Sequence, residues 1–157
     1  MTSVVEGRAE EARWSIPGPL AGIAEALAPR KGWITRRPID TIPAPELPIT
    51  VTLTCDEITT LDPRTRQPDF ATAEIVYRPG RRLIDSKSLH AYIVDLRPVG
   101  FSMERLATVL AADILAACRA AWVEVTVREK SRGGVAITAV CRIVEQKDAF
   151  DEWAGSH

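Results

Sequence analysis

The chain has 157 residues, which fits one domain, and its 46% hydrophobic and 26% charged residues are ordinary for a globular protein. A formal net charge of −1 gives no strong field, so neither nucleic acid nor an anionic membrane surface is expected as a partner. No apolar run approaches the ~20 residues of a membrane span, and Met1 to Arg13 lacks the features of a signal peptide, so we expect a cytoplasmic protein.

Residues 1–45 are predicted to form an N-terminal extension with one short helix. Apolar side chains recur at helical spacing from Pro19 to Ala28, and Pro29 is expected to end this helix. Four further prolines between Pro38 and Pro48 predict an extended connection without helix.

Residues 46–145 are predicted to form the folded domain, which begins with two strands. Apolar residues alternate with threonines from Ile49 to Cys55, a pattern typical of a half-buried strand. A polar loop from Asp62 to Pro68 separates it from a second strand over Phe70 to Tyr77, which the Pro79-Gly80 turn closes.

Two helices and two more strands follow. Apolar spacing predicts a helix from about Ser86 and a second one that ends near Ala121. Strands are expected over Trp122 to Val127 and Val135 to Val144, with a turn between them. The order ββααββ predicts an α+β protein with an antiparallel sheet, and residues 146–157 are expected to be a C-terminal tail.

Cysteine and histidine usage indicates neither disulfides nor zinc. Cys55, Cys118 and Cys141 are odd in number and widely spaced, which is unlike a disulfide framework. The chain has two histidines and no Cys-x-x-Cys, so no metal site of the usual Cys/His type is expected.

The first motif lies in the polar loop and its flanks and reads Asp62-Pro63-Arg64-Thr65-Arg66-Gln67-Pro68-Asp69-Phe70. It resembles the active-site segment of the NADPH-dependent nitrile reductases that convert 7-cyano-7-deazaguanine to its aminomethyl product in queuosine biosynthesis. In that family a cysteine sits seven residues before the aspartate, and Asp62 stands at that position here. Cys55 matches an earlier, non-catalytic cysteine of the family and is expected to be a small core residue.

This resemblance implies the tunnelling fold, an α+β fold in which two helices cover one face of the antiparallel sheet. It also implies NADPH as a possible cofactor and a small heterocyclic substrate. Subunits of this fold close their sheets into a barrel by assembling, so we expect a homo-oligomer with sites between subunits. The exposed edges of a four-stranded sheet make such assembly physically reasonable.

The second motif reads Asp85-Ser86-Lys87-Ser88-Leu89-His90-Ala91-Tyr92 and is similar to the family signature Glu-Ser-Lys-Ser-Leu-Lys-Leu-Tyr. The resemblance implies that Asp85 and Ser86 bind the deazaguanine, and that Lys87 and His90 lie near NADPH. His90 replaces a lysine, which can remove a positive charge beside the cofactor. Taken by themselves, these residues are also typical of a capped, solvated helix start.

The third motif runs from Arg97 to Glu104, where the family has an arginine followed seven residues later by a glutamate. A carboxylate such as Glu104 suits a guanine-like ring, which offers a ring N–H and an exocyclic amine as donors. Met103 replaces the family's histidine and is expected to be a core residue. Resemblance also places Arg132 and Gly133 near the cofactor phosphates, although Arg-Gly-Gly alone indicates a hairpin turn.

Asp62 changes the chemistry that this site can perform. A thiolate attacks a nitrile to form a thioimide that NADPH then reduces, whereas a carboxylate attacks nitriles poorly. If Asp62 and Asp69 lie close together, one carboxyl pKa is expected to rise, and the pair can serve as acid and base. The alternative is that Asp62 only caps the turn before Pro63.

Three functions follow. The first is an enzyme that uses Asp62 and Asp69 for hydration, hydrolysis or ring closure on a deazapurine, purine or pterin-like base. The second is a paralogue that binds such a base without turnover. The third is the family's own reductase activity.

Overall fold

The computed structural model describes residues 37–145 of the chain. The helix predicted over Pro19 to Ala28 and the predicted tail lie outside the described residues, so the proposed boundaries at residues 45 and 145 stay predictions. Neither helix within 37–145 is long and apolar enough to cross a membrane.

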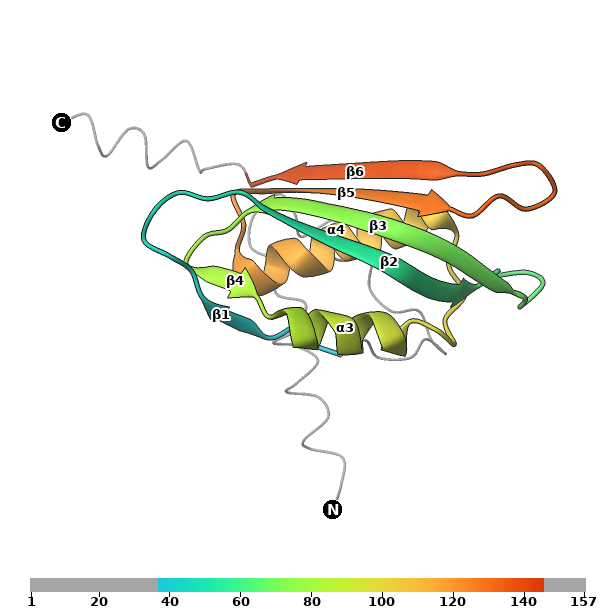
Figure 1. Ribbon diagram of the computed structural model, residues 1–157, viewed down its shortest axis with the longest axis horizontal. Coiled ribbons are helices and arrows are strands. Elements are labelled where there is room, and N and C mark those ends of the chain that lie inside the picture. Colours follow the sequence, from blue (N-terminus) through green and yellow to red (C-terminus); the bar gives the residue numbers. More distant parts are fainter. Residues whose placement is uncertain (1–36, 146–157) are drawn as a thin grey trace, which may run out of the picture.

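The main sheet has four antiparallel strands in the spatial order β2-β3-β5-β6. Its strands are β2 (Val51–Leu61), β3 (Pro68–Arg78), β5 (Trp122–Glu129) and β6 (Thr138–Val144). Helices α3 (Ser86–Asp95) and α4 (Met103–Cys118) lie together on one face of this sheet (Figure 1). The predicted α+β class, with two helices on one face of an antiparallel sheet, is therefore confirmed.

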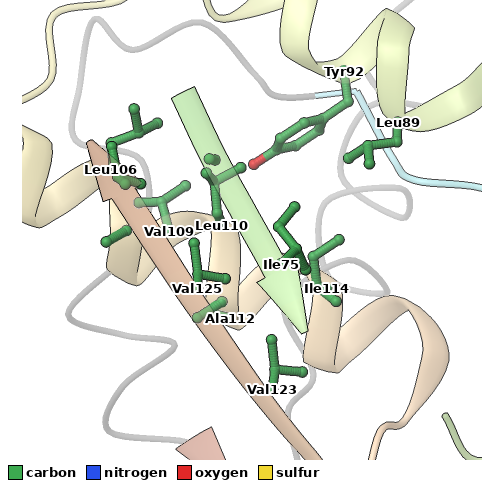
Figure 2. Packing of buried hydrophobic residues seen from close by; sticks show 14 of the residues in the cluster. Ile75, Leu89, Tyr92, Leu106, Val109, Leu110, Ala112, Ile114, Val123 and Val125 are labelled. Carbon is green, nitrogen blue, oxygen red and sulfur yellow. The ribbon is translucent and has the colours of Figure 1, made fainter. Parts of the chain in front are cut away.

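The sheet face that meets α4 forms the core. Alternate β3 residues from Asp69 to Tyr77 are buried, as the period-2 geometry of a strand requires. Figure 2 shows Leu110 and Ile114 of α4 among the side chains packed towards Ile75 and Val125 of the sheet. Each fully buried aliphatic side chain of this kind contributes about 1.5–3 kcal/mol.

Polar contacts fix the two helices against their neighbours. The Tyr92 hydroxyl of α3 donates to Asp113 of α4 at 2.6 Å. Ser102 caps the start of α4 by accepting from the Arg105 N–H at 3.3 Å. The helix ends at Cys118, earlier than predicted, because Arg119 adopts a left-handed backbone with φ 46°.

The sequence interpretation missed a small second sheet of two short strands, β1 (Thr41–Pro43) and β4 (Arg82–Ile84). Both strands have only three residues, and β1 lies in the proline-rich segment predicted as an extended connection without helix. Their pairing depends on residues far apart in the sequence: the Ala44 N–H donates to the Arg81 carbonyl at 3.0 Å.

β2 is longer than the predicted strand and contains a bulge between Cys55 and Ile58. The bulge changes which residues face the helices: Val51, Leu53 and Cys55 are half-buried before it, and Ile58 and Thr60 are buried after it. After the bulge, β2 continues to Leu61, where the polar loop begins. At the opposite edge of the sheet, β6 begins at Thr138 because Val135 pairs with Arg132 inside the turn.

We expect Leu110→Ala to lower the free energy of unfolding by about 2–5 kcal/mol, because Leu110 is 0% exposed and its removal leaves a cavity against the sheet. Leu47→Ala is the matched control, since Leu47 is 77% exposed, and its effect should stay within about 0.5 kcal/mol. Urea unfolding of both variants measures this difference. Equal losses would contradict the assignment of α4 as the centre of the core.

Candidate functional site

The residues predicted to form the site fall into two groups within one chain. The β2–β3 loop, the α3–α4 connection and the β5–β6 hairpin lie at the same end of the molecule (Figure 1). We call this the sheet end, and it carries Asp62, Asp69, Glu104 and Arg132. Gly133 follows Arg132 at this end, and the remaining predicted residues, Asp85, Ser86, Lys87 and His90, lie at the N-cap and along α3. This helix starts beside β4 and runs towards the sheet end.

Asp62 begins the loop after β2 and caps it. Its carboxylate Oδ1 accepts from the backbone N–H groups of Arg64 at 2.8 Å and Thr65 at 2.7 Å. Its backbone N–H donates to the Gln67 carbonyl at 2.8 Å, and its carbonyl accepts from the Arg66 N–H at 3.0 Å. The turn-capping role considered for Asp62 is thus present in the structure.

The electrostatic setting of Asp62 favours its charged form. The backbone N–H groups of Thr65 and then Arg64, with a smaller contribution from the Arg132 charge, lower the pKa of the Asp62 carboxyl below its usual value. This direction is opposite to the rise expected for one member of a close carboxylate pair. Asp62 is therefore an ionised acceptor and a weak base.

Asp69 and Arg132 form an ion pair that joins the start of β3 to the β5–β6 hairpin. Asp69 lies near the start of β3 with only 4% of its surface exposed, and its Oδ1 accepts from an Arg132 guanidinium N–H. Arg132 precedes Gly133 and Gly134, which adopt positive φ values of 57° and 82° that favour glycine. The structure thus brings a predicted catalytic residue and a predicted cofactor residue into direct contact.

The α3–α4 connection closes the free edge of β2 at this end. The Leu61 N–H donates to the Val99 carbonyl, and the Phe101 N–H donates to the Leu61 carbonyl, each at 3.0 Å. Gly100 packs tightly here, because a Cβ atom would meet Pro63 Cα at 3.2 Å and an Arg66 guanidinium nitrogen at 3.1 Å. This docking carries the start of α4 to the loop that holds Asp62.

The first turn of α4 presents one of the two residues that the third motif singled out. Glu104 is exposed in that turn, where a negative charge interacts favourably with the helix dipole. Met103 is 2% exposed, which confirms its predicted place in the core. Glu104 is therefore available to a ligand, and Met103 is not.

The second motif forms the start of α3, and part of it serves as a helix cap. The Asp85 carboxylate accepts from the Ser88 N–H at 3.1 Å, as an N-cap does. The Ser88 hydroxyl in turn accepts from the Asp40 N–H at 2.7 Å. Ser86, Lys87 and His90 are exposed and are free of such structural duties in the described part of the chain.

A pocket of about 280 Å³ lies between β2 and α3. Ser86 and His90 line it from the helix, and Cys55 lines it from the strand. Burial, and then the charge of Asp56, raise the pKa of the Cys55 thiol, so the thiolate is disfavoured. Arg97, the first residue of the third motif, also lines this pocket, although the sequence analysis gave it no binding role.

No group of three or more metal-ligating side chains occurs between residues 37 and 145. The predicted site residues of the sheet end contribute the carboxylates of Asp62, Asp69 and Glu104 and the guanidinium of Arg132. These groups suit the recognition of a ligand with N–H donors and an anionic group.

Comparison with known proteins gives a consistent picture. The model of the QueF-like protein family matches residues 68–148. The NADPH-dependent 7-cyano-7-deazaguanine reductase of Frankia casuarinae is 39% identical over 103 residues, which are 66% of this chain and 82% of that protein. The enzyme of the same name from Halorhodospira halophila is 38% identical over 93 residues, which cover 59% of this chain and 79% of that protein.

A solved structure supports the same fold. The apo crystal structure of the archaeosine synthase QueF-Like superposes with a TM-score of 0.59 at 20% identity, covering 65% of this chain and 100% of that one. At this identity the likeness concerns the fold. The tunnelling fold implied by the sequence motifs is confirmed.

We expect the stability contributed by the Asp62 charge to depend on pH. A carboxyl whose pKa is lower in the folded state stabilises the fold above its unfolded pKa of about 3.9, and this contribution is lost as the pH falls through the folded value. Asp62→Asn keeps an oxygen for the turn and removes the charge. The stability difference from wild type should therefore be present at neutral pH and shrink on acidification.

Asp62→Ala is the matched comparison, because it removes the turn acceptor as well as the charge. It should lose additional stability at every pH. Denaturant unfolding across the acid range measures both differences. A wild-type advantage over Asp62→Asn that grows on acidification would contradict the lowered pKa.

Proposed function

Because the chain belongs to the QueF-like family, we propose that it binds a 7-deazaguanine, purine or pterin-like base at the sheet end without reducing a nitrile. The observation that carries this proposal is the Asp62 carboxylate, which caps a turn at the position that we align with the family's cysteine. Recognition of the base is separable from reduction, since the two depend on different residues.

Base recognition is assigned to Glu104 from the sheet end and to Ser86 and Asp85 from the start of α3. Glu104 is exposed at a helix start, so its two oxygens can accept from the paired donors of a guanine-like ring. Asp85 is already engaged as a helix cap, which leaves Ser86 as the exposed polar group of that pair.

No other cysteine replaces the missing nucleophile. Cys55 points into the pocket beside α3, and its raised pKa disfavours a thiolate. Burial raises the pKa of Cys118 to about 12, and Cys141 on β6 is also shifted upwards by burial. The three thiols of this chain are thus poor nucleophiles.

NADPH is the proposed cofactor, and four residues are its candidate contacts. They are Lys87 and His90 on α3, and Arg132 and Gly133 at the hairpin. NADPH would supply hydride to a reducible ligand, but Arg132 is already paired with Asp69. A cofactor phosphate must compete with that carboxylate, so we expect weak cofactor binding.

Acid/base chemistry by Asp62 and Asp69 is the second candidate, covering hydration, hydrolysis or ring closure of the bound base. Both carboxylates act on the same guanidinium of Arg132, which favours their sharing one site. The lowered pKa of Asp62 makes it better suited to stabilising positive charge than to removing a proton.

A homo-oligomer with sites between subunits is proposed from the separation of the two residue groups. Ser86 and Lys87 lie at the start of α3, while the sheet end lies beyond the other end of that helix (Figure 1). A base that contacts both groups therefore needs a second copy of the chain. The edge strands β2 and β6 provide surfaces through which such copies can pair.

We expect titration calorimetry to detect binding of 7-cyano-7-deazaguanine by the wild-type protein, with no NADPH consumption in an absorbance assay. Glu104→Gln should weaken this binding about tenfold or more, since it replaces a charged acceptor with an amide. Glu46→Gln is the matched control on an exposed segment. Clear NADPH consumption would refute the argument from Asp62, and absence of binding would refute base recognition.

Asp62→Cys extends the same test to covalent chemistry. The variant should form a thioimide adduct with the nitrile that intact-mass spectrometry detects. Wild-type protein is the control, because its own three cysteines are then exposed to the same reagent. An adduct on wild type, or none on a folded variant that binds the base, would contradict the placement of position 62 at the reactive carbon.

Mixing two variants that do not bind the base tests whether one site uses two chains. We expect Ser86→Trp to block the α3 half-site, and Glu104→Lys, which reverses the charge, to block the sheet end. Subunits mixed by co-refolding should recover base binding in about a quarter of sites if each site draws on two chains. No recovery in mixed oligomers would place the whole site within one chain.

A further inference from the structure

Thr60 is a buried residue of β2 whose hydroxyl lacks a partner. The residue is 1% exposed, and its Oγ1 makes no hydrogen bond with any group of residues 37–145. Buried hydroxyl groups in folded proteins are nearly always hydrogen-bonded, because burial removes their hydration. The Thr60 hydroxyl is therefore available to donate to an acceptor on the neighbouring strand.

The nearest candidate partner by strand register is Asp69. Thr60 and Asp69 lie directly opposite each other in the β2–β3 ladder, and both are buried on the same face. Side chains in such a pair have Cβ atoms about 5 Å apart. A change of the Thr60 χ1 rotamer is therefore enough to direct its hydroxyl towards the Asp69 carboxylate.

Arg132, the ion-pair partner of Asp69, is much more exposed to solvent than Asp69 itself. The Asp69 side chain is 5% exposed, whereas that of Arg132 is 41% exposed on the β5–β6 hairpin. The hairpin glycines Gly133 and Gly134 have no neighbouring atoms within 4 Å of a Cβ position. An anionic ligand group can thus reach the Arg132 guanidinium. If the guanidinium then leaves Asp69, the buried Asp69 carboxylate needs another donor.

We propose that Thr60 is a positioning residue of the sheet end: its hydroxyl donates to Asp69 when Arg132 turns to an anionic ligand group. The proposal rests on the proposed function for the nature of the ligand, while the exchange of donors is a property of the chain alone. The exchange keeps Asp69 oriented and paired, so Arg132 can leave without stranding a buried charge.

A double-mutant cycle tests this exchange without any ligand. Arg132→Met removes the guanidinium, and Thr60→Val removes the hydroxyl while keeping the side-chain shape. In the wild-type background Thr60→Val should barely change the unfolding equilibrium constant, because the hydroxyl is unpartnered there. In the Arg132→Met background it should favour unfolding by about tenfold or more, since a hydrogen bond to a charged group is lost.

Thr60→Ser is the matched control, because it keeps the hydroxyl. In the Arg132→Met background it should therefore not show the loss of stability that Thr60→Val causes. The ¹³Cγ chemical shift of Asp69 gives a second readout, which should respond to Thr60→Val only when Arg132 is absent. Equal effects of Thr60→Val in both backgrounds, or the same loss with Thr60→Ser, would overturn the proposal. If Arg132→Met does not fold, Arg132→Ala serves in the same cycle, because it also leaves no donor at position 132.

These measurements use neither base nor cofactor. Failure of the cycle would leave base binding intact, and failure of base binding would leave the donor exchange intact. The two proposals can thus be refuted separately.

Discussion

Burial of α4 against one face of the four-stranded sheet is the constraint on which the rest of the structure depends. The apolar face of α4 and the alternate inward residues of β3 and β5 cannot be removed from water separately. Packing them together fixes the direction of α4 along the sheet. The start of α4 and the loops at the ends of β2 and β5 then lie at the same end of the molecule (Figure 1).

The sheet end combines structural and chemical duties in the same side chains. Asp62 caps its own loop, and Asp69 anchors the β5–β6 hairpin through Arg132. Among the residues predicted for the site, this end carries the carboxylates of Asp62, Asp69 and Glu104 and the guanidinium of Arg132. Such a set recognises and orients a ligand more readily than it attacks a nitrile carbon. The chain combines this set with the fold of the QueF-like family.

The resemblance carried by three short motifs was specific enough to identify the family, because each motif combines several residues at fixed spacing. Periodicity alone gave the two helices and the four long strands. The missed elements were the short strands β1 and β4, whose three residues each carry no periodic signal. The bulge at Asp56 and Glu57 was also invisible, since its effect is to change which face later residues occupy.

The sequence by itself determined the order of the long elements, the α+β class and the family to which the chain belongs. These properties are local, because helical and strand spacing and motif identity are written within short segments. Only the tertiary structure decided that Asp69 pairs with Arg132, that Thr60 is buried opposite Asp69, and that the α3 residues lie apart from the sheet end. Such relations join segments distant in the chain, and their energies arise from burial and close approach, which no single segment contains.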